Sequence, residues 1–160
     1  MEMVCRELNG RSGLGVAYEL LEELYRQQTG KPLPRILRTE RGKPYFAEGG
    51  WHFSVSHTKR RAFCVLSRRN VAVDAEELDR QIDLRLARKI LSPGEKAQFD
   101  AAEDRRLALL KFWVLKEAAA KLSGEGLRGY PRDTDFSLND PRIKITDNCL
   151  VAVMEEEYAV

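Results

Sequence analysis

Two long stretches of the chain repeat apolar residues at spacings of three and four, which is the period of an amphipathic helix. The first covers residues 14–28 and stops at Gly30, ahead of two prolines. The second runs from about Asp104 to Ser123 and is closed by Gly124. Its apolar stripe consists of Ala108, Phe112, Leu115, Ala119 and Leu122. We predict that both helices pack on the core along their apolar stripes.

Several shorter stretches alternate apolar and polar residues, or are apolar throughout, as β-strands are. The predicted strands are residues 35–39, 52–57, 62–66 and 71–76, followed by 136–138, 143–145 and 150–153. Strands 52–57 and 62–66 are predicted to form a hairpin. Between the blocks of strands, Ile82, Leu86 and Ile90 indicate a further helix, and Ser92-Pro93-Gly94-Glu95 has the signature of a helix N-terminus. Two blocks of strands with helices between them predict an α+β fold in a single domain, residues 1–160.

Composition favours one ordinary soluble domain. The 160 residues, of which 43% are hydrophobic and 32% charged, can bury one core. The apolar runs are far shorter than the roughly 20 residues of a membrane span, and the segment from Met1 to Arg11 carries charges where a secretory signal needs an apolar block. The three cysteines are widely spaced, which favours reduced thiols. We therefore expect a cytoplasmic location and no membrane partner.

Charge is distributed unevenly along the chain, although the formal net charge is only +2. Residues 26–69 hold eleven Lys or Arg against two Glu, whereas residues 70–160 hold fourteen basic and eighteen acidic residues. The basic segment can attract phosphate groups and the acidic one a metal ion. No aromatic residues recur at a stacking interval and the whole chain is nearly neutral, so nucleic acid is not an expected partner.

The predicted strand at 71–76 places two carboxylates on one face. Side chains two apart in a strand share a face at about 6.6 Å, so Asp74 and Glu76 point one way and Val71, Val73 and Ala75 the other. Two carboxylates this close repel each other unless a cation lies between them. Mg²⁺ suits such a pair, because it takes one or two carboxylates and completes its octahedron with water and substrate phosphates. The simpler interpretation is an acidic strand end in solvent.

The second long helix carries a polar face opposite its apolar stripe. Trp113, Lys116, Glu117, Ala120 and Lys121 are predicted to lie there, so that two ammonium groups flank one carboxylate beside a small residue. Such a face can hold an anion together with a cation. The alternative is a solvated face whose Glu–Lys pairs are each worth about 0.2–0.5 kcal/mol.

Two motifs in the basic segment are candidate phosphate ligands. Gly42-Lys43-Pro44 holds a lysine at a stiffened turn. Ser54-Val55-Ser56-His57 ends a strand with one of the two histidines of the chain, and this side chain could hydrogen-bond a phosphate. Taken singly, a solvated lysine and a hairpin-capping histidine are the commoner outcomes.

Read in order, four motifs resemble the 4'-phosphopantetheinyl transferase superfamily, most closely its larger, surfactin-synthetase-type branch. The motifs are Gly42-Lys43-Pro44, Ser54-Val55-Ser56-His57, Val73-Asp74-Ala75-Glu76, and the stretch from Trp113 through Lys116-Glu117-Ala118 to Lys121. The resemblance covers roughly residues 14–155. Its specific part is the last motif following a hydrophobic Asp-x-Glu strand, whereas Gly-Lys-Pro or Ser-x-Ser-His alone would arise by chance.

The resemblance implies a Mg²⁺-dependent transfer of the 4'-phosphopantetheine arm from coenzyme A to a serine of an apo acyl or peptidyl carrier protein. Adenosine 3',5'-bisphosphate is released. By this resemblance, Asp74, Glu76 and Glu117 hold the metal ion on the pyrophosphate, and Glu117 is also the candidate base for the serine hydroxyl. Lys116 and Lys121 bind phosphate oxygens and assist the leaving group. The adenosine end is expected to contact Lys43, Pro44, Ser56 and His57.

The resemblance also implies a pseudo-twofold fold with halves at about 1–69 and 70–160 and a site between them in one chain. The first half is expected to be shortened and to lack its opening strands. Family members tend to bind their acidic carrier proteins after the Asp-x-Glu strand, where this chain has Arg85, Arg88 and Lys89. Without a carrier partner, these residues are simply a solvated helix face.

Two other functions fit part of the same pattern. Acidic pairs with lysine also occur in metal-dependent phosphodiesterases and nucleases, but there an acid-x-Lys usually lies on the strand following the first aspartate, whereas here the lysines lie on a predicted helix in Lys116-Glu117 order. A non-catalytic module that binds coenzyme A or a carrier protein is the second alternative, because the first half is expected to be shorter than in the family. The presence of all three acidic residues favours an enzyme.

Overall fold

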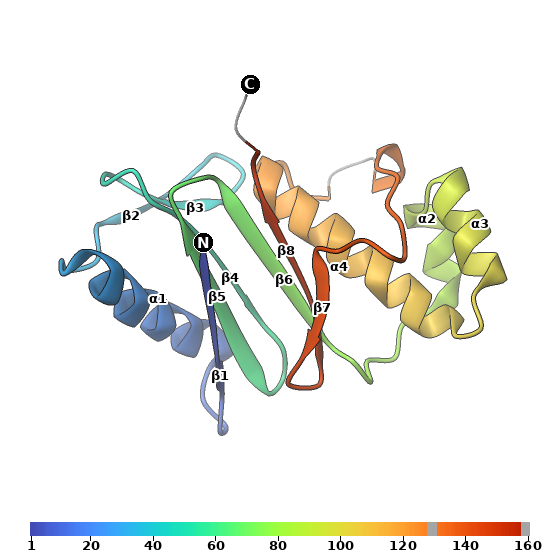
Figure 1. The fold of residues 1–160 in the computed structure, drawn as a ribbon, viewed down its shortest axis with the longest axis horizontal. Helices are drawn as coiled ribbons and strands as arrows, with labels where there is room; N and C mark the ends of the chain where they lie inside the picture. Colours follow the sequence, from blue (N-terminus) through green and yellow to red (C-terminus); the bar gives the residue numbers. More distant parts are fainter. Residues whose placement is uncertain (128–130, 158–160) are drawn as a thin grey trace.

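The computed structural model describes residues 1–127 and 131–157, which form two three-stranded antiparallel sheets, each covered by one long helix (Figure 1). The first part of the chain contains β1 (Glu2–Glu7), α1 (Gly13–Thr29), β2 (Ile36–Arg38), β3 (Pro44–Phe46), β4 (His52–His57) and β5 (Arg61–Ser67). The second contains β6 (Val71–Glu77), η1 (Leu84–Leu86), α2 (Ala87–Ile90), α3 (Pro93–Ala101), α4 (Arg105–Ser123), η2 (Pro131–Asp133), β7 (Ile143–Thr146) and β8 (Cys149–Glu155). The predicted α+β class is confirmed.

The two sheets have the same internal order. In each, the first strand pairs with the last and the last pairs with the one before it, giving β1-β5-β4 and β6-β8-β7. A long helix lies between the first strand and the closing hairpin in both cases, α1 in one and α4 in the other. Strands β2 and β3 form a separate hairpin beside the first sheet. None of the helices in the described ranges has the length and hydrophobicity needed to cross a bilayer.

Strand β1 stands where the sequence predicted no element. It pairs antiparallel with β5 along its whole length. The expectation that the first half lacks opening strands is therefore wrong for this strand. Its sequence signal is weak because the strand is short and partly charged and has partly buried apolar side chains on both faces. Val4 packs against the α1 core cluster, while Met3 and Cys5 pack against the cluster between the sheets.

The core is layered as helix, sheet, sheet and helix. One cluster lies between α1 and the first sheet, one between the two sheets, and one between the second sheet and α4. Strand β6 contributes Val71, Val73 and Ala75 to the cluster between the sheets. Because alternate side chains of a strand face opposite ways, Asp74 and Glu76 point away from that cluster, as the sequence predicted.

The two sheets meet along a seam between β4 and β6 that is closed by serine side chains. The backbone N–H of Val73 donates to Ser54 Oγ at 3.1 Å, and that of Ala75 donates to Ser56 Oγ at 3.2 Å. Both strands advance by two residues from one bond to the next, so they run parallel. Each serine hydroxyl replaces the carbonyl that a sheet neighbour would supply, and the two buried N–H groups of β6 are thereby satisfied.

Two predicted elements differ in the region between β6 and β7. The helix expected around Ile82, Leu86 and Ile90 is a 3₁₀ turn followed by a single α-helical turn. The strand expected at 136–138 is not formed, because side chains of α3 satisfy its backbone: Phe136 N–H donates to Glu95 Oε2 at 2.9 Å, and Leu138 N–H to Gln98 Oε1 at 3.0 Å. Residues 128–130, in the glycine-rich segment after α4, lie outside the described residues.

Candidate functional site

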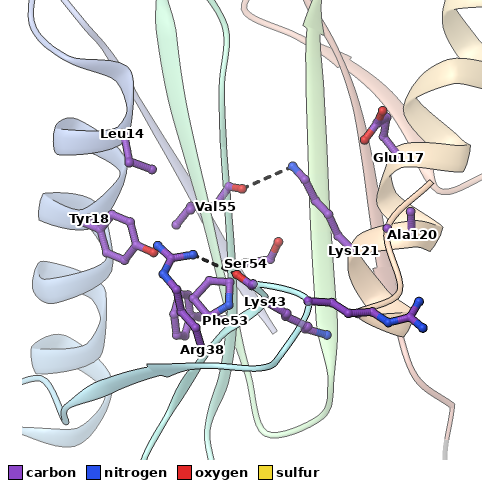
Figure 2. A pocket seen from close by; sticks show the side chains of 15 residues that line it. Leu14, Tyr18, Arg38, Lys43, Phe53, Ser54, Val55, Glu117, Ala120 and Lys121 are labelled. Carbon is purple, nitrogen blue, oxygen red and sulfur yellow. Dashed lines mark hydrogen bonds between the residues drawn. The ribbon is translucent and has the colours of Figure 1, made fainter. Parts of the chain in front are cut away.

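A cavity of about 300 Å³ opens between α1, the β2–β3 hairpin, strand β4 and the C-terminal part of α4. Its lining includes four basic side chains, namely Arg38, Arg41, Lys43 and Lys121. Apolar and aromatic side chains also line it, namely Leu14, Tyr18, Phe53 and Val55. Figure 2 shows residues of α1 facing Glu117, Ala120 and Lys121 of α4 across this space. The lining suits a ligand that combines negative charge with an apolar or aromatic part.

Lys43 enters the cavity wall from a turn that requires glycine. Gly42 has a φ of 88°, a conformation open to glycine at no steric cost. The Lys43 ammonium donates to Asn70 Oδ1 at 2.8 Å and to the carbonyl of Leu122 at 2.9 Å. Burial lowers the pKa of Lys43. Lys43 therefore ties the hairpin to the last turn of α4 while it lines the cavity, a connection that the sequence did not predict.

Lys121 lies at the seam between the two sheets. Its ammonium donates to the carbonyls of Val55 at 3.4 Å and Val73 at 3.0 Å, and to Asp74 Oδ1 at 3.0 Å (Figure 2 shows the contact with Val55). One carbonyl belongs to β4 and the other to β6, so a single side chain of α4 connects both sheets to the acidic strand face. About a third of the Lys121 side chain, 34%, stays exposed to the cavity.

Three carboxyl groups influence one another where β6 faces α4. Burial raises the pKa of Asp74, and the nearby Lys121 ammonium partly opposes this. Burial also raises the pKa of Glu76, against the effect of Arg80. The pKa of Glu117 is raised to about 6, first by burial and then by the charge of Asp74, with a smaller effect from Glu76. The structure thus brings the three predicted acidic residues into one electrostatic group.

Two of these carboxylates are paired with cationic side chains of the chain itself. Lys121 pairs with Asp74, and Arg80 donates a hydrogen bond to Glu76. Asp74 Oδ2 is buried and has no hydrogen-bond partner among the described residues. Within residues 1–127 and 131–157, no three His, Cys, Asp or Glu side chains are arranged to hold a metal ion. The oxygen-only donor set and the orphaned Oδ2 fit a hard divalent cation, but the two paired carboxylates must first exchange their partners.

Lys116 does not lie on the open polar face of α4 that the helix period predicted for it. Its side chain is only 1% exposed and forms an ion pair at 2.7 Å with Glu95 of α3, which is 0% exposed. Lys116 also donates to Thr134 Oγ1 at 2.8 Å. Successive residues of a helix differ in direction by about 100°. Glu117 therefore faces the cavity while Lys116 points towards α3, outside the cavity lining.

Ser56 and His57, which the resemblance assigns to the adenosine end of coenzyme A, lie outside the lining of this cavity. Ser56 is buried at the seam, where its hydroxyl accepts the bond from Ala75. His57 packs against the start of α1, since a Cβ placed on Gly13 would lie 2.3 Å from His57 Nδ1. The His57 side chain lines a second hollow, of about 800 Å³, together with Glu76 and Arg80. Neither Ser56 nor His57 lines the cavity that contains Lys43, Pro44, Glu117 and Lys121.

The sequence missed several residues of the site. Arg38 and Arg41 were noted only as part of a basic segment, and Tyr18 only as part of a helix stripe. Arg80 had no signal, because a turn after β6 brings it back to Glu76 and no periodic pattern describes that contact. Asn70, which joins Lys43 to Leu122, lies in a polar turn that reads as solvent-exposed.

Comparison with known proteins locates the second part of the chain in a family. A model of the 4'-phosphopantetheinyl transferase superfamily matches residues 70–153, which run from just before β6 into β8. The 4'-phosphopantetheinyl transferase HetI of Nostoc sp. (strain PCC 7120) is 33% identical over 95 residues, 54% of this chain and 40% of that protein. The 4'-phosphopantetheinyl transferase AcpT of Escherichia coli O157:H7 is 37% identical over 101 residues, 60% and 52% of the two chains.

A further relative agrees with these two. The AcpT of Salmonella typhimurium is 34% identical over 99 residues, which cover 58% of this chain and 51% of that protein. The chain spans about half the length of the curated relatives that it matches. The family model covers more than half of this chain, including the strand with Asp74 and Glu76 and the helix with Glu117 and Lys121. The chain therefore belongs to the 4'-phosphopantetheinyl transferase superfamily.

Proposed function

We propose that the chain transfers the 4'-phosphopantetheine arm of coenzyme A to a serine of an apo carrier protein and releases adenosine 3',5'-bisphosphate. One observation carries the proposal: Lys121 lies between a basic, partly aromatic cavity and the carboxylates at β6, with Glu117 on the same wall. In this proposal, the cavity binds the adenosine diphosphate part of coenzyme A. The adjoining carboxylates hold a cation on its pyrophosphate.

The cavity lining suggests that different cationic side chains bind different phosphates of coenzyme A. Arg38, Arg41 and Lys43 are placed to bind phosphates at the adenosine end, and Tyr18 and Phe53 offer apolar surface to its base. Pro44 fixes the turn that carries Lys43. Lys121 is near both the cavity and the acids, so it is the proposed partner of the pyrophosphate and of the leaving phosphate. His57 opens to the second hollow, where an extended part of the ligand or the carrier can reach it.

Asp74, Glu76 and Glu117 are the proposed ligands of Mg²⁺. The ion supplies charge neutralisation on the pyrophosphate when it is bound. Their oxygen donors, their mutual repulsion and the unpartnered Asp74 Oδ2 support this assignment. The assignment requires Lys121 and Arg80 to leave Asp74 and Glu76 when the ion and the co-substrate enter.

The proton and bond changes can be assigned to residues of this chain. The serine oxygen of the carrier forms a bond to the β-phosphorus of coenzyme A, and the bond from that phosphorus to the bridging oxygen breaks. Glu117, whose pKa of about 6 leaves it ionised at neutral pH, accepts the serine proton. Lys121 stabilises the charge on the departing adenosine 3',5'-bisphosphate. Lys116, sealed against Glu95, has a positioning role in this proposal and no contact with phosphate.

The arrangement of the halves belongs to the same proposal. The equal strand orders of the two sheets, each with a helix after its first strand, support a pseudo-twofold relation between residues of about 1–69 and 70–160. The cavity receives residues from α1 and β4 on one side and from α4 on the other, which supports a site within one chain. Sedimentation that shows an obligate trimer would count against a single-chain site.

An acidic carrier protein is proposed to dock on η1 and α2. Arg85 is 90% exposed beside Asp83, Leu84 is 43% exposed, and Arg88 and Lys89 are exposed next to them. Reversing the charge of Arg88 and Lys89 to glutamate should weaken carrier binding, with a strong salt dependence, and leave coenzyme A binding unchanged. Unchanged carrier affinity in a binding titration would leave this surface a solvated helix face.

The deciding experiment weighs an apo carrier protein by mass spectrometry after incubation with the chain, coenzyme A and Mg²⁺. Transfer adds the mass of one phosphopantetheine group and should be lost in E117Q, while E103Q, a change of an exposed glutamate before α4, should keep it. Binding of coenzyme A without transfer would indicate a non-catalytic module. Cleavage of coenzyme A without a carrier would indicate a phosphodiesterase.

A further inference from the structure

Arg80 is a cation beside the carboxylates of β6 that belongs to none of the sequence motifs, and the proposed function requires of it only that it leave Glu76. Arg80 lies in the turn after β6, where its backbone N–H donates to the backbone carbonyl of Glu77 at 3.0 Å. Arg106 of α4 holds the same turn by donating to the carbonyls of Leu78 at 3.0 Å and Arg80 at 2.8 Å. The backbone of Arg80 is therefore fixed against α4, although its side chain stays 40% exposed.

The guanidinium of Arg80 turns back onto the acidic face of β6. It donates a hydrogen bond to Glu76 Oε1, and its central carbon lies 5.9 Å from the centre of the Trp113 ring. Its charge lowers the pKa of Glu76 more than any other charge does, and it also lowers those of Asp74 and Glu117, where Lys121 has the larger effect. The charge of Lys121 likewise lowers the pKa of Asp74 and of Glu117, but the Lys121 ammonium is also hydrogen-bonded to two backbone carbonyls. Among the described residues, Glu76 is the one hydrogen-bond acceptor of the Arg80 side chain.

We propose that Arg80 is an internal counter-ion that occupies Glu76 in the ligand-free protein and leaves it when a divalent cation binds. The inference rests on the proposed function in taking Glu76 as a ligand of that cation. A guanidinium and a divalent ion are both positively charged, so they repel each other and compete when both lie close to the same carboxylate. The ion therefore binds only to the fraction of molecules in which Arg80 has moved away, and its apparent affinity falls by that fraction.

This exchange gives Arg80 two effects on the site. Without a cation, it prevents three neighbouring carboxylates from repelling one another. With a cation present, it raises the concentration at which the ion binds, so that the carboxylates stay occupied by the chain itself at low ion concentration. Because the pair is partly exposed and close in sequence, its release should change the apparent affinity by roughly five- to tenfold.

The test is a titration of the chain with Mn²⁺ alone, followed by the electron paramagnetic resonance signal of the free ion. We expect R80M, which keeps an apolar contact with Trp113, to bind Mn²⁺ roughly five- to tenfold more tightly than the unchanged chain. R80K, which retains a weaker competitor, should lie between the two. The matched control is R26M, because Arg26 also pairs with a glutamate four residues away but does so on the surface of α1.

Equal or weaker Mn²⁺ binding by R80M overturns the proposal, as does the absence of Mn²⁺ binding by both proteins. A second readout is thermal unfolding without added metal, in which R80M should melt at a lower temperature and recover more than the unchanged chain when Mn²⁺ is added. The transfer assay on the unchanged chain separates this inference from the proposed function. Transfer with unaltered R80M affinity refutes the role of Arg80 alone, and tighter binding without transfer supports that role while refuting the function.

Discussion

The two sides of α4 carry the same pair of charges in different surroundings. On one side, Lys116 and Glu95 form an ion pair at 2.7 Å whose side chains are 1% and 0% exposed. On the other, Lys121 and Asp74 pair at 3.0 Å with 34% and 10% exposure, beside the cavity. The two lysines are five residues apart on one helix. Their roles differ because of what each side of the helix faces.

A sealed ion pair and a half-open one respond differently to change. Breaking a buried pair leaves a charge without compensation in a medium of low dielectric constant, so the fold loses stability. A pair at a cavity wall can exchange its partner for a ligand, so its loss affects binding and reaction more than folding. We therefore expect the Lys116 side of α4 to contribute stability and the Lys121 side to contribute function.

The largest expected effect is that of K116M. It leaves Glu95 buried and charged, so the free energy of unfolding should fall by about 3–5 kcal/mol in urea denaturation. K116M/E95Q should regain part of the loss, because the glutamine is neutral and its one side-chain oxygen can still accept one of the two backbone hydrogen bonds, from Ser92 or Phe136, that Glu95 accepts. Loss of transfer in K116M with unchanged stability would show instead that Lys116 contacts the substrate.

K121M should have the opposite effect to K116M, with a large loss of transfer rate and a small loss of stability. Removing the ammonium from the cavity wall should lower the transfer rate by about 10²–10³-fold, a magnitude typical for the loss of one preorganised charge-stabilising group. Stability should change by only about 1 kcal/mol, because the side chain is partly exposed. K144M, a change of an exposed lysine on β7, is the control and should transfer normally. Transfer at the normal rate by K121M would contradict the contrast between the two sides.

The seam next to Lys121 allows a smaller and more local test. S56A removes the acceptor of the Ala75 N–H and leaves a buried donor unsatisfied, which should cost about 1–3 kcal/mol of unfolding free energy. S56T keeps the hydroxyl and should recover part of it. If Ser56 binds the co-substrate, as the family resemblance implies, S56A should instead weaken coenzyme A binding in a calorimetric titration and leave stability unchanged.

The smallest expected effect is a pH dependence that arises from Glu117. Its pKa is raised from 4.5 to about 6 in the folded chain, so the folded state binds more protons than the unfolded state between these values. The contribution of this group to stability is therefore greatest below about pH 4.5 and declines as the pH rises to 6. In metal-free buffer at pH 7.5, E117Q should be more stable than the unchanged chain by about 1 kcal/mol, after allowance for solvent screening. A less stable E117Q would contradict this.

Local sequence signals predicted much of the fold. The periodicity of α1 and α4, the alternation in β4 and β6, and the capping box at Ser92 are all present as expected. Strand β1 and the loop at 136–138 could not be predicted, since each depends on a partner distant in sequence. One lies against β5 and the other receives hydrogen-bond acceptors from α3.

The sequence by itself determined which residues share a face: Asp74 with Glu76 on β6, and Glu117 with Lys121 on α4. These follow from the fixed periods of strand and helix, which act over a few residues. Only the tertiary structure decided that Lys116 is sealed against Glu95, that Ser54 and Ser56 close a seam, and that Arg80 returns to Glu76. Burial and hydrogen-bond partners are set by segments that meet in space, and no local period carries that information.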